Sequence, residues 1–553
     1  MKSLITILLA LSASFPGFAQ VITDGEFSDW TFINPISDPT GDQQYFDLTE
    51  ARVFNDSLAI HFYIQGADFW QLNSEYGLTL YIDTDFDDQT GTPFADLGAD
   101  LIWNFAQRNG TWQGATVEHS DVGMYSAPTV TSDQFEVAFS KHNGLQFGDS
   151  IRFVWSVFQG VDDRLPDTGS ITYRQHGGSY AYTPIDLNPS ANALRVMTYN
   201  VEHDGLADPV HSAALGRMIA TADPDIITFN ELWDTDASYV ATFLNGILPL
   251  NGAMWQTVKL FNGNVTASRY PITQSYEFEP GDRVLITVID LPSNYPSDIV
   301  IANLHLKCCD DDDRRQDQVD NLVDFYRDLH TPMGNLNVPF ATPFIVMGDM
   351  NFVGDRAQIE TVLNGDVVQE GTYGFDFVPD WDNSPLKEVL PYHTDQRHAY
   401  TWPGQGSSYY PGRLDFIFYS DYVLQLEKSF VLNTDGMSSA RLTTTGLVAN
   451  DAHLASDHLP VIADFVWNNV SGISEPEKPE LLIRPNPAEE AATLSWRKGT
   501  VNKIEVRDTQ GRLLDQFQVG ADEITRDLNT SDYPAQPLWI IVDGQFAYPL
   551  IVQ

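Results

Sequence analysis

The chain has 553 residues, more than one hydrophobic core usually organises, so we expect several domains. A content of 43% hydrophobic, 12% aromatic and 19% charged residues excludes a wholly disordered, collagen-like or coiled-coil protein. The net charge of −46 excludes capture of polyanions by a diffuse basic surface, so a phosphate-bearing partner would need a metal ion or a few local cations.

The first 19 residues have the composition of a secretory signal peptide. Lys2 precedes an apolar run from Leu4 to Leu11, and Gly17-Phe18-Ala19 forms a small-residue cleavage site. No later apolar run reaches the roughly 18 residues that a membrane-spanning helix needs. We therefore expect a secreted or cell-surface protein without a transmembrane segment, acting as a monomer.

The composition then divides the rest of the chain into three blocks. Residues 20–186 carry short alternating runs such as Leu58–Ile64, separated by Gly, Asn and Asp turns, which predicts an all-β sandwich. Residues 194–467 alternate strand and helix patterns, which predicts an α/β domain. Residues 481–553 are again β-like and small. Segments of linker composition separate the blocks at 187–193 and 470–480.

In the middle block, polar groups lie in or directly after strand-like segments. The six segments are Arg195–Asn200, Asp225–Glu231, Ile299–His305, Phe344–Asn351, Gly412–Phe418 and Ser456–Val461. Apolar runs such as Ile345-Val346-Met347 indicate buried strands. Ligand sites in sheet proteins commonly lie at such strand ends, so we expect these polar groups to share one edge.

The types of these residues favour a hard divalent cation. Oxygen donors of this kind suit Mg²⁺, Mn²⁺ or Ca²⁺ better than Zn²⁺, which more often recruits His or Cys; they are Asn200, Glu231, Asp349, Asn351 and Asp457. His305 and His458 add imidazoles that can transfer protons near neutral pH. Together these groups predict metal-assisted hydrolysis of phosphoesters.

Short motifs in these segments make a family resemblance specific. In chain order they are Tyr-Asn-Val (199–201), Asn-Glu (230–231), His-Leu-Lys (305–307), Gly-Asp-Met-Asn (348–351), Arg-Leu-Asp (413–415) and Ser-Asp-His-Leu-Pro-Val (456–461). The middle block resembles the endonuclease/exonuclease/phosphatase superfamily, which includes deoxyribonuclease I-like enzymes and neutral sphingomyelinases. The resemblance implies an α/β two-sheet sandwich.

The resemblance also implies a metal site. Glu231 would be the principal ligand of Mg²⁺ or Mn²⁺, with Asn200 and Asp457 in the metal and phosphate shell. For Arg269 and Arg315, a phosphate contact and a structural ion pair are about equally favoured.

A catalytic group is implied in the same way. Asp349 would orient or deprotonate the attacking water, and Asn351 would contact the scissile phosphate. His458 would be the catalytic imidazole, oriented by Asp415, and His305 would be a second imidazole at the phosphate.

Two features next to His305 stand outside these motifs. Cys308 and Cys309 are the only cysteines, so they allow no long-range disulfide; loop packing or a vicinal bridge is favoured over a redox role. Asp310–Asp313 is a run of four acids, which predicts a solvated loop tip or, as a hypothesis, an additional Ca²⁺ site.

The first domain resembles family-9-like carbohydrate-binding and DOMON-type β-sandwiches through Asp24–Trp30 and Leu80–Gly91, which implies a possible glycan partner. An alternate spacing of acids predicts either a structural Ca²⁺ loop or an acidic hairpin turn; the acids are Asp83, Asp85 and Asp87. Three tryptophans could stack on sugar rings, although core positions are favoured: Trp70, Trp103 and Trp112.

The last domain resembles the C-terminal sorting domain of type IX secretion. The resemblance rests on Ile483–Ala488, Val506–Leu514 and Leu528–Pro534. It implies export across an outer membrane through the type IX secretion machinery.

These expectations combine into a secreted, divalent-metal-dependent phosphodiesterase that hydrolyses nucleic acid. A sphingomyelinase-like lipid phosphodiesterase is the alternative within the family. A surface glycan-binding protein with an inert central domain is the alternative outside enzymes, and the intact motifs around Glu231, Asp349 and His458 argue against it.

Overall fold

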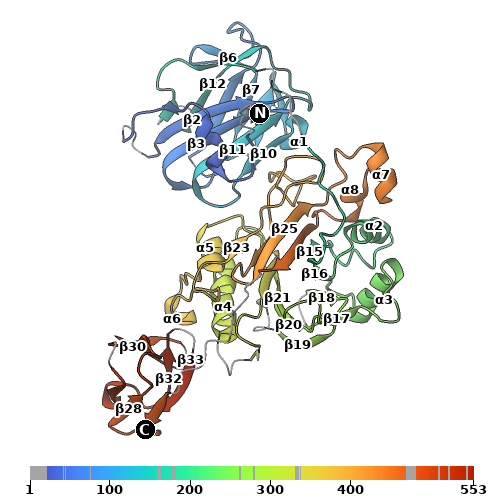
Figure 1. Cartoon of the computed structure of the whole chain (residues 1–553). Helices are drawn as coiled ribbons and strands as arrows, with labels where there is room; N and C mark the ends of the chain where they lie inside the picture. The colour runs from blue at the N-terminus through green and yellow to red at the C-terminus, as the bar shows by residue number, and fades with distance from the viewer. Residues whose placement is uncertain are drawn as a thin grey trace, which may run out of the picture. The chain divides into compact units, whose positions relative to one another are not determined.

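Figure 1 shows the computed structural model of the chain. It describes residues 21–552 except 42, 44, 75, 159–162, 177, 179–181, 261–262, 278–280, 331–334, 337, 469–480, 509–510, 521–522 and 544–545. The predicted signal peptide and the linker at 470–480 lie outside the described residues. Within these ranges, no helix combines the length and the apolar character that crossing a membrane requires. The chain divides into two compact units, Met1–Pro128 with Ser132–Ala181, and Thr129–Thr131 with Tyr182–Gln553.

The first unit is built from two antiparallel sheets. One has the order β1-β2-β3-β11-β10, and the other has the order β13-β12-β4-β7-β8-β9 with β14 also paired to β12. The strands are β1 (Ile36–Ser37), β2 (Leu48–Asn55), β3 (Ala59–Trp70), β4 (Thr79–Asp83), β7 (Leu101–Asn104), β8 (Asn109–Trp112), β9 (Ala115–Val117), β10 (Met124–Ala127), β11 (Ser132–Ser140), β12 (Ser150–Val157), β13 (Asp163–Leu165) and β14 (Ile171–Arg174). A short hairpin of β5 (Thr92–Phe94) and β6 (Leu97–Ala99), the 3-10 helix η1 (Phe27–Phe32) and helix α1 (His119–Val122) complete the unit.

An aromatic core lies between these two sheets. The Phe62 ring on β3 lies 5.1 Å from the Phe153 ring on β12, and the Trp103 ring on β7 lies 5.8 Å from the Phe139 ring on β11. Trp103 is fully buried and Trp70 is 3% exposed, so both belong to this core and present no sugar-stacking face. Trp112 is half-buried.

The central part of the second unit contains two six-stranded mixed sheets. The first has the order β17-β18-β16-β15-β26-β25, and the second has the order β19-β20-β21-β22-β24-β23. Their strands are β15 (Leu194–Asn200), β16 (Ile226–Asn230), β17 (Gln256–Lys259), β18 (Val265–Ser268), β19 (Ile272–Glu277), β20 (Val284–Ile289), β21 (Ile299–His305), β22 (Phe344–Asp349), β23 (Lys387–Glu388), β24 (Asp415–Tyr419), β25 (Leu424–Val431) and β26 (Val461–Trp467).

Helices connect and cover these sheets. They are α2 (Ser212–Ala222), α3 (Ala237–Ile247), α4 (Asp312–Leu329), α5 (Ala357–Asn364), α6 (Glu370–Tyr373), α7 (Ser439–Thr445) and α8 (Asp451–Ala455). Side chains of β21 alternate between two cores, as the period of a strand requires. Ile299 and Ile301 enter the core shared with the first sheet and with α2 and α3. Val300 and Ala302 enter the core shared with α4.

The pairing of strands brings the predicted site residues into register. The pairs β15–β16 and β21–β22 are parallel, so their carboxyl ends coincide. Asn200 is paired with Asn230, and His305 is paired with Asp349. Asp349 is in turn opposite Asp415 at the start of β24. His305, Asp349 and Asp415 therefore form one row across the second sheet.

The acidic run Asp310–Asp313 marks the beginning of helix α4. Asp311 is the N-cap residue, and Asp312 and Asp313 lie in the first turn, where negative charge stabilises the exposed N–H groups of a helix. Asp312 pairs with Arg315 and accepts a hydrogen bond from Gln358. Among the described residues, these four acids form no group with ligand atoms as close as a shared cation requires.

The C-terminal residues form two small antiparallel sheets, β27-β28-β31 and β30-β29-β32-β33. Their strands are β27 (Leu482–Arg484), β28 (Ala491–Ser495), β29 (Lys503–Arg507), β30 (Leu513–Gln518), β31 (Thr525–Asn529), β32 (Pro537–Val542) and β33 (Phe546–Ile551), with the 3-10 helix η3 (Thr530–Asp532). The described chain is thus mostly β, with several sheets and a few helices, and the central domain is compatible with the predicted α/β two-sheet sandwich.

Candidate functional site

The central site is organised around the buried carboxylate of Asp349. Its Oδ2 accepts a hydrogen bond from Asn200 Nδ2 at 2.9 Å. The same oxygen lies 3.7 Å from Nε2 of His305 and 3.7 Å from Nε2 of His458. The alternation of strand side chains explains this meeting: Ile345, Met347 and Asp349 share the face of β22 that looks into the core between the two sheets.

Glu231 approaches the same group from the end of β16. Its Oε1 accepts a hydrogen bond from Asn200 Nδ2 at 3.1 Å and lies 3.9 Å from His305 Nε2. Glu231 has a φ of 65°, a left-handed conformation that is uncommon for residues with a side chain. Strained backbone of this kind recurs at functional positions, where surrounding contacts hold it. Here the carbonyl of Glu231 accepts a hydrogen bond from the Asp204 N–H at 2.8 Å.

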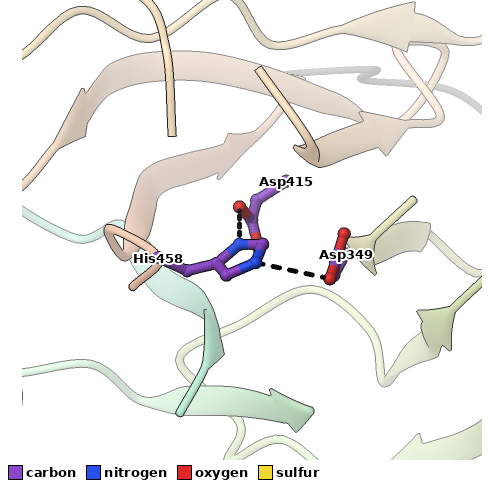
Figure 2. A group of neighbouring side chains, drawn as sticks. All are labelled: Asp349, Asp415 and His458. Atoms are coloured by element: carbon purple, nitrogen blue, oxygen red, sulfur yellow. Dashed lines mark hydrogen bonds and ion pairs between the residues drawn. The ribbon is translucent and has the colours of Figure 1, made fainter. Parts of the chain in front are cut away.

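His458 is fixed by Asp415, as Figure 2 shows. Its Nδ1 donates to Asp415 Oδ2 at 2.8 Å, which leaves Nε2 turned toward Asp349. The hydroxyl of Thr401 donates to the same Asp415 oxygen at 2.6 Å and accepts from the Asp415 N–H at 2.9 Å. Asp415 is therefore held on two sides, and the imidazole it orients has one free nitrogen for chemistry.

Gly348 allows β22 to approach β21 closely enough to present Asp349. Its φ is 151°, and a Cβ at this position would lie 1.8 Å from the backbone oxygen of Leu304. Any other residue would push β22 away from β21. In the Gly-Asp motif, the glycine thus allows the two strands to pack closely, and the aspartate supplies the carboxylate of the site.

Asn230 connects the two sheets behind the site. Its Nδ2 donates to Asn303 Oδ1 and to the carbonyl of Leu304, each at 3.0 Å. Its Oδ1 accepts the N–H of Asp349 at 3.0 Å. The Asn-Glu motif at 230–231 did not predict this role of Asn230. A signal was available, since Asn230 and Asn303 are polar residues within otherwise apolar buried strands.

Burial and neighbouring charges shift the titration of the central groups. Burial raises the pKa of Asp349 to about 7, and the charge of Asp415 adds to the shift. Burial alone would lower the pKa of His458, but the charges of Asp415 and Asp349 raise it well above the usual range. Burial lowers the pKa of His305 to about 3, assisted by the charges of Arg283 and His458. His305 is therefore neutral, and its Nδ1 is buried without a hydrogen-bond partner among the described residues.

The donor set fits a hard divalent cation. The carboxylate oxygens of Glu231 and Asp349 converge on the Asn200 amide, and no Lys or Arg nitrogen makes a hydrogen bond or ion pair with either carboxylate among the described contacts. The pKa of Asp349 is raised because a buried carboxylate resists ionisation, and the charge of His458 opposes this shift. Glu231 is the best-placed ligand because its carboxylate keeps 20% exposure. In this structure Asn200 turns its amide nitrogen toward the carboxylates.

The remaining predicted residues lie around this group. Asn351 donates from Nδ2 to the carbonyl of Leu306 at 3.2 Å, and its own N–H donates to Asp349 Oδ1 at 3.1 Å. Asp457 is exposed and accepts a hydrogen bond from Trp402 Nε1 at 3.2 Å. The ring of Trp233 lies 5.7 Å from that of His305. The two indoles were not predicted; Trp233 lies two residues after Glu231, whereas Trp402 lies in a segment outside all the motifs.

The structure does not bring Arg269 and Arg315 to this group; of the two roles weighed for them, it shows the ion pair in each case. Arg269 pairs with Asp223 and donates to the carbonyl of Pro224, next to the start of β16, whereas Glu231 follows its end. Arg315 is fully buried and donates to the carbonyls of Lys307 and Cys309. Both guanidinium groups stabilise loops, because every carbonyl of a buried turn needs a donor.

A second acidic group lies in the N-terminal unit. Ligand atoms of Asp83, Asp85 and Asp100 lie within 4.8 Å of one another. Asp83 pairs with Arg152, whose Nε is 2.9 Å from Asp83 Oδ2, and Asp100 accepts from the N–H and the hydroxyl of Thr84, each at 2.9 Å. The predicted structural Ca²⁺ at this loop stays a prediction.

Comparisons with known proteins agree with the central domain. Residues 197–458 match the model of the Endonuclease/Exonuclease/phosphatase family. This match confirms the family predicted for the central part of the chain. No curated protein matches the chain.

Solved structures with likeness to the chain include three of low identity. An endonuclease/exonuclease/phosphatase from Beutenbergia cavernae is 15% identical, with a TM-score of 0.33, and the match covers 65% of this chain and 98% of that one. TDP2 of D. rerio, humanized by 14 mutations, is 15% identical, with a TM-score of 0.32, covering 50% and 99%. Sphingomyelinase C from Streptomyces griseocarneus is 13% identical, with a TM-score of 0.31, covering 49% and 99%.

Proposed function

Because residues 197–458 form a domain of the endonuclease/exonuclease/phosphatase family, we propose that the chain is a divalent-metal-dependent phosphodiesterase that hydrolyses nucleic acid. The observation that carries the proposal is the convergence at Asp349. Asn200, His305 and His458 come from three different segments of the chain, and all face one carboxylate oxygen within 3.7 Å. Folding alone does not require this arrangement, because burying a charged group costs free energy.

The residues divide the chemistry among them. Glu231, with Asn200 and Asp457 nearby, would hold the cation, which supplies charge to offset that on the phosphoryl and leaving oxygens. Asp349 takes the proton of the attacking water as the new P–O bond forms. His458 presents Nε2, fixed by the bond between its Nδ1 and Asp415, and provides a proton to the leaving oxygen as the old P–O bond breaks. The 3.7 Å between Asp349 Oδ2 and His458 Nε2 is short enough for the proton to return by way of one water.

Two indoles next to this group support a nucleic acid substrate. Trp233 adjoins His305, and Trp402 is hydrogen-bonded to Asp457. Both side chains are half-buried and so keep surface on which a base can stack. Stacking supplies binding energy without net positive charge, which suits a chain with a net charge of −46. We expect single strands to be better substrates than duplexes, which are bound chiefly through phosphate charge.

The flanking parts extend the proposal. We place the protein outside the cell, exported by its first 19 residues and sorted through its C-terminal domain by type IX secretion, with a glycan as a possible partner of the N-terminal sandwich. A secreted full-length chain recovered from culture medium, with its amino terminus near Gln20, would support this placement; retention inside the cell would contradict it.

The test of function offers the purified full-length chain four substrates: single-stranded DNA, RNA, sphingomyelin and bis-p-nitrophenyl phosphate. Each is assayed with Mg²⁺, Mn²⁺ or EDTA, beside the His458→Ala variant. Nucleic acid cleavage that EDTA and the variant both abolish supports the proposal. Release of choline phosphate from sphingomyelin alone would replace it with a lipid phosphodiesterase, and inactivity on all four would contradict an enzyme of this type.

A further inference from the structure

Cys308 and Cys309 lie in the loop between β21 and α4, beside the candidate site but outside its chemistry. The two Sγ atoms are 2.7 Å apart, with the Cys309 thiol donating to Cys308. Cys309 is exposed and Cys308 is half-buried, so a small solute can reach the pair. No predicted role in phosphoester hydrolysis uses either thiol.

Buried neighbours fix the backbone on both sides of the pair. Arg315 Nη1 donates to the carbonyls of Lys307 at 2.8 Å and Cys309 at 2.7 Å. The N–H of Lys307 donates to Gln318 Oε1 at 2.8 Å. These contacts hold Cys309 at a φ of 70°, which a residue with a side chain rarely adopts. The contact between the sulfurs is therefore imposed by the fold.

The charges around the pair distinguish the two sulfurs. The ammonium of Lys307 lies 3.9 Å from Cys308 Sγ. The contact with Cys308, together with burial, raises the pKa of the Cys309 thiol. Cys308 is thus placed as the attacking sulfur, and Cys309 as the resolving one.

We propose that Cys308 and Cys309 form a reversible dithiol–disulfide site that reacts with small organic disulfides. The Cys308 thiolate attacks one sulfur of RSSR, forming a mixed disulfide and releasing RS⁻. Cys309 then loses its proton and attacks the Cys308 sulfur, which closes the Cys308–Cys309 bridge and releases the second RS⁻. Two electrons pass from the protein to RSSR, and two equivalents of RSH result.

The bridge is expected to be easily reduced. Adjacent Cα atoms are only ~3.8 Å apart, below the usual Cα separation in disulfides, so a vicinal bridge is strained. Strained, exposed disulfides belong to the labile class rather than the structural one. The bridge lies close to the candidate site along the chain. The carbonyl of Leu306, two residues before Cys308, accepts a hydrogen bond from the Asn351 side chain.

The experiment treats the reduced full-length protein with glutathione disulfide and measures its intact mass and its free thiols. We expect both thiols to disappear, the mass to fall by two hydrogens and no glutathione to remain attached; dithiothreitol should restore both thiols. Cys309→Ser and Cys308→Ser should instead each retain one glutathione, with Cys309→Ser reacting faster. Lys307→Gln should slow the first step by about twofold, the size of an exposed charge contact.

Either of two results would overturn the proposal. One is a wild-type protein that keeps glutathione attached or forms an intermolecular dimer without an internal bridge. The other is a pair of thiols that survives an excess of glutathione disulfide. Both readouts are independent of any hydrolase activity, so a failure of the proposed function would leave this test intact.

Discussion

Two acidic groups of similar size differ in what balances their charge. In the N-terminal sandwich, Asp83 is paired with a guanidinium, Arg152, and Asp85 is exposed to solvent. In the central domain, Asp349 and Asp415 are both buried, and their ionisable partners are imidazoles: His458 for each, with His305 equally close to Asp349.

The difference indicates which of the two acidic groups a bound cation would stabilise. A guanidinium is always charged and compensates a carboxylate permanently. An imidazole can gain or lose its charge and can exchange protons with its partners. One carboxylate of the N-terminal group is therefore compensated by a guanidinium within the fold, whereas the carboxylates of the central group face imidazoles and carry oxygens that a cation would stabilise.

The largest effect should follow from removing the central imidazole. We expect His458→Ala to lower kcat by about 10²-fold or more, since the variant loses its acid–base group. Steady-state hydrolysis of bis-p-nitrophenyl phosphate measures this. His453→Ala is the matched control, because His453 pairs with Asp435 and touches none of the central group; its kcat should stay within about twofold. Equal losses in both variants would remove His458 from the mechanism.

Metal binding should show directly which of the two acidic groups holds the cation. Mn²⁺ at 100 times its Kd should stabilise the EDTA-treated protein by about 2.7 kcal/mol, seen as a higher unfolding midpoint. Glu231→Gln should abolish the shift, because it removes the most exposed carboxylate of the central group. Asp85→Asn should leave it in place. A shift that disappears in Asp85→Asn and survives in Glu231→Gln would place the cation in the N-terminal sandwich.

The amide that links the two central sheets should matter for stability. Asn230→Ala leaves the N–H of Asp349 and three oxygen acceptors without this partner, so we expect a loss of about 2 kcal/mol in the free energy of unfolding. Urea unfolding at fixed metal concentration measures it. Asn188→Ala, at an exposed position, should change the value by less than about 0.5 kcal/mol. Similar losses in the two variants would show that the hydrogen bonds of Asn230 contribute no more to stability than an exposed side chain does.

A buried histidine outside both groups gives a pH reference. Burial lowers the pKa of His393 to about 4, and Asn433 donates to its Nδ1, which a second proton would displace. The unfolded chain binds this proton near pH 6.5 and the folded chain does not, so stability falls as the pH drops from 6.5 to 4. The contribution is about 1.4 kcal/mol per pH unit in that window.

The measurement is the slope of the unfolding free energy against pH. His393→Gln should reduce that slope, because it removes the buried group whose pKa is lowered. An unchanged slope in His393→Gln would show that other groups control acid unfolding, and the comparison of the two acidic groups would then need measurement above pH 6.5.

Much of the central site could be predicted because its residues end strands. Parallel pairing aligns the ends of β21 and β22, so a polar residue after each apolar run arrives at the same edge. The indoles of Trp233 and Trp402 could not be predicted in the same way, since each depends on how a loop returns to the sheet. The arginines show the converse: the sequence left a phosphate contact and an ion pair equally favoured, and only the structure shows that Arg315 is committed to carbonyls of its own loop.

The amino-acid sequence by itself determined the family of the central domain and the order of its motifs, because strand periodicity and the residues that end each strand are local properties. Only the tertiary structure decided that Asn230 joins the sheets, that Thr401 holds Asp415 and that two neighbouring thiols touch. Each of these contacts depends on the distance between segments far apart in the chain, or on a backbone angle that distant residues impose, and packing sets both.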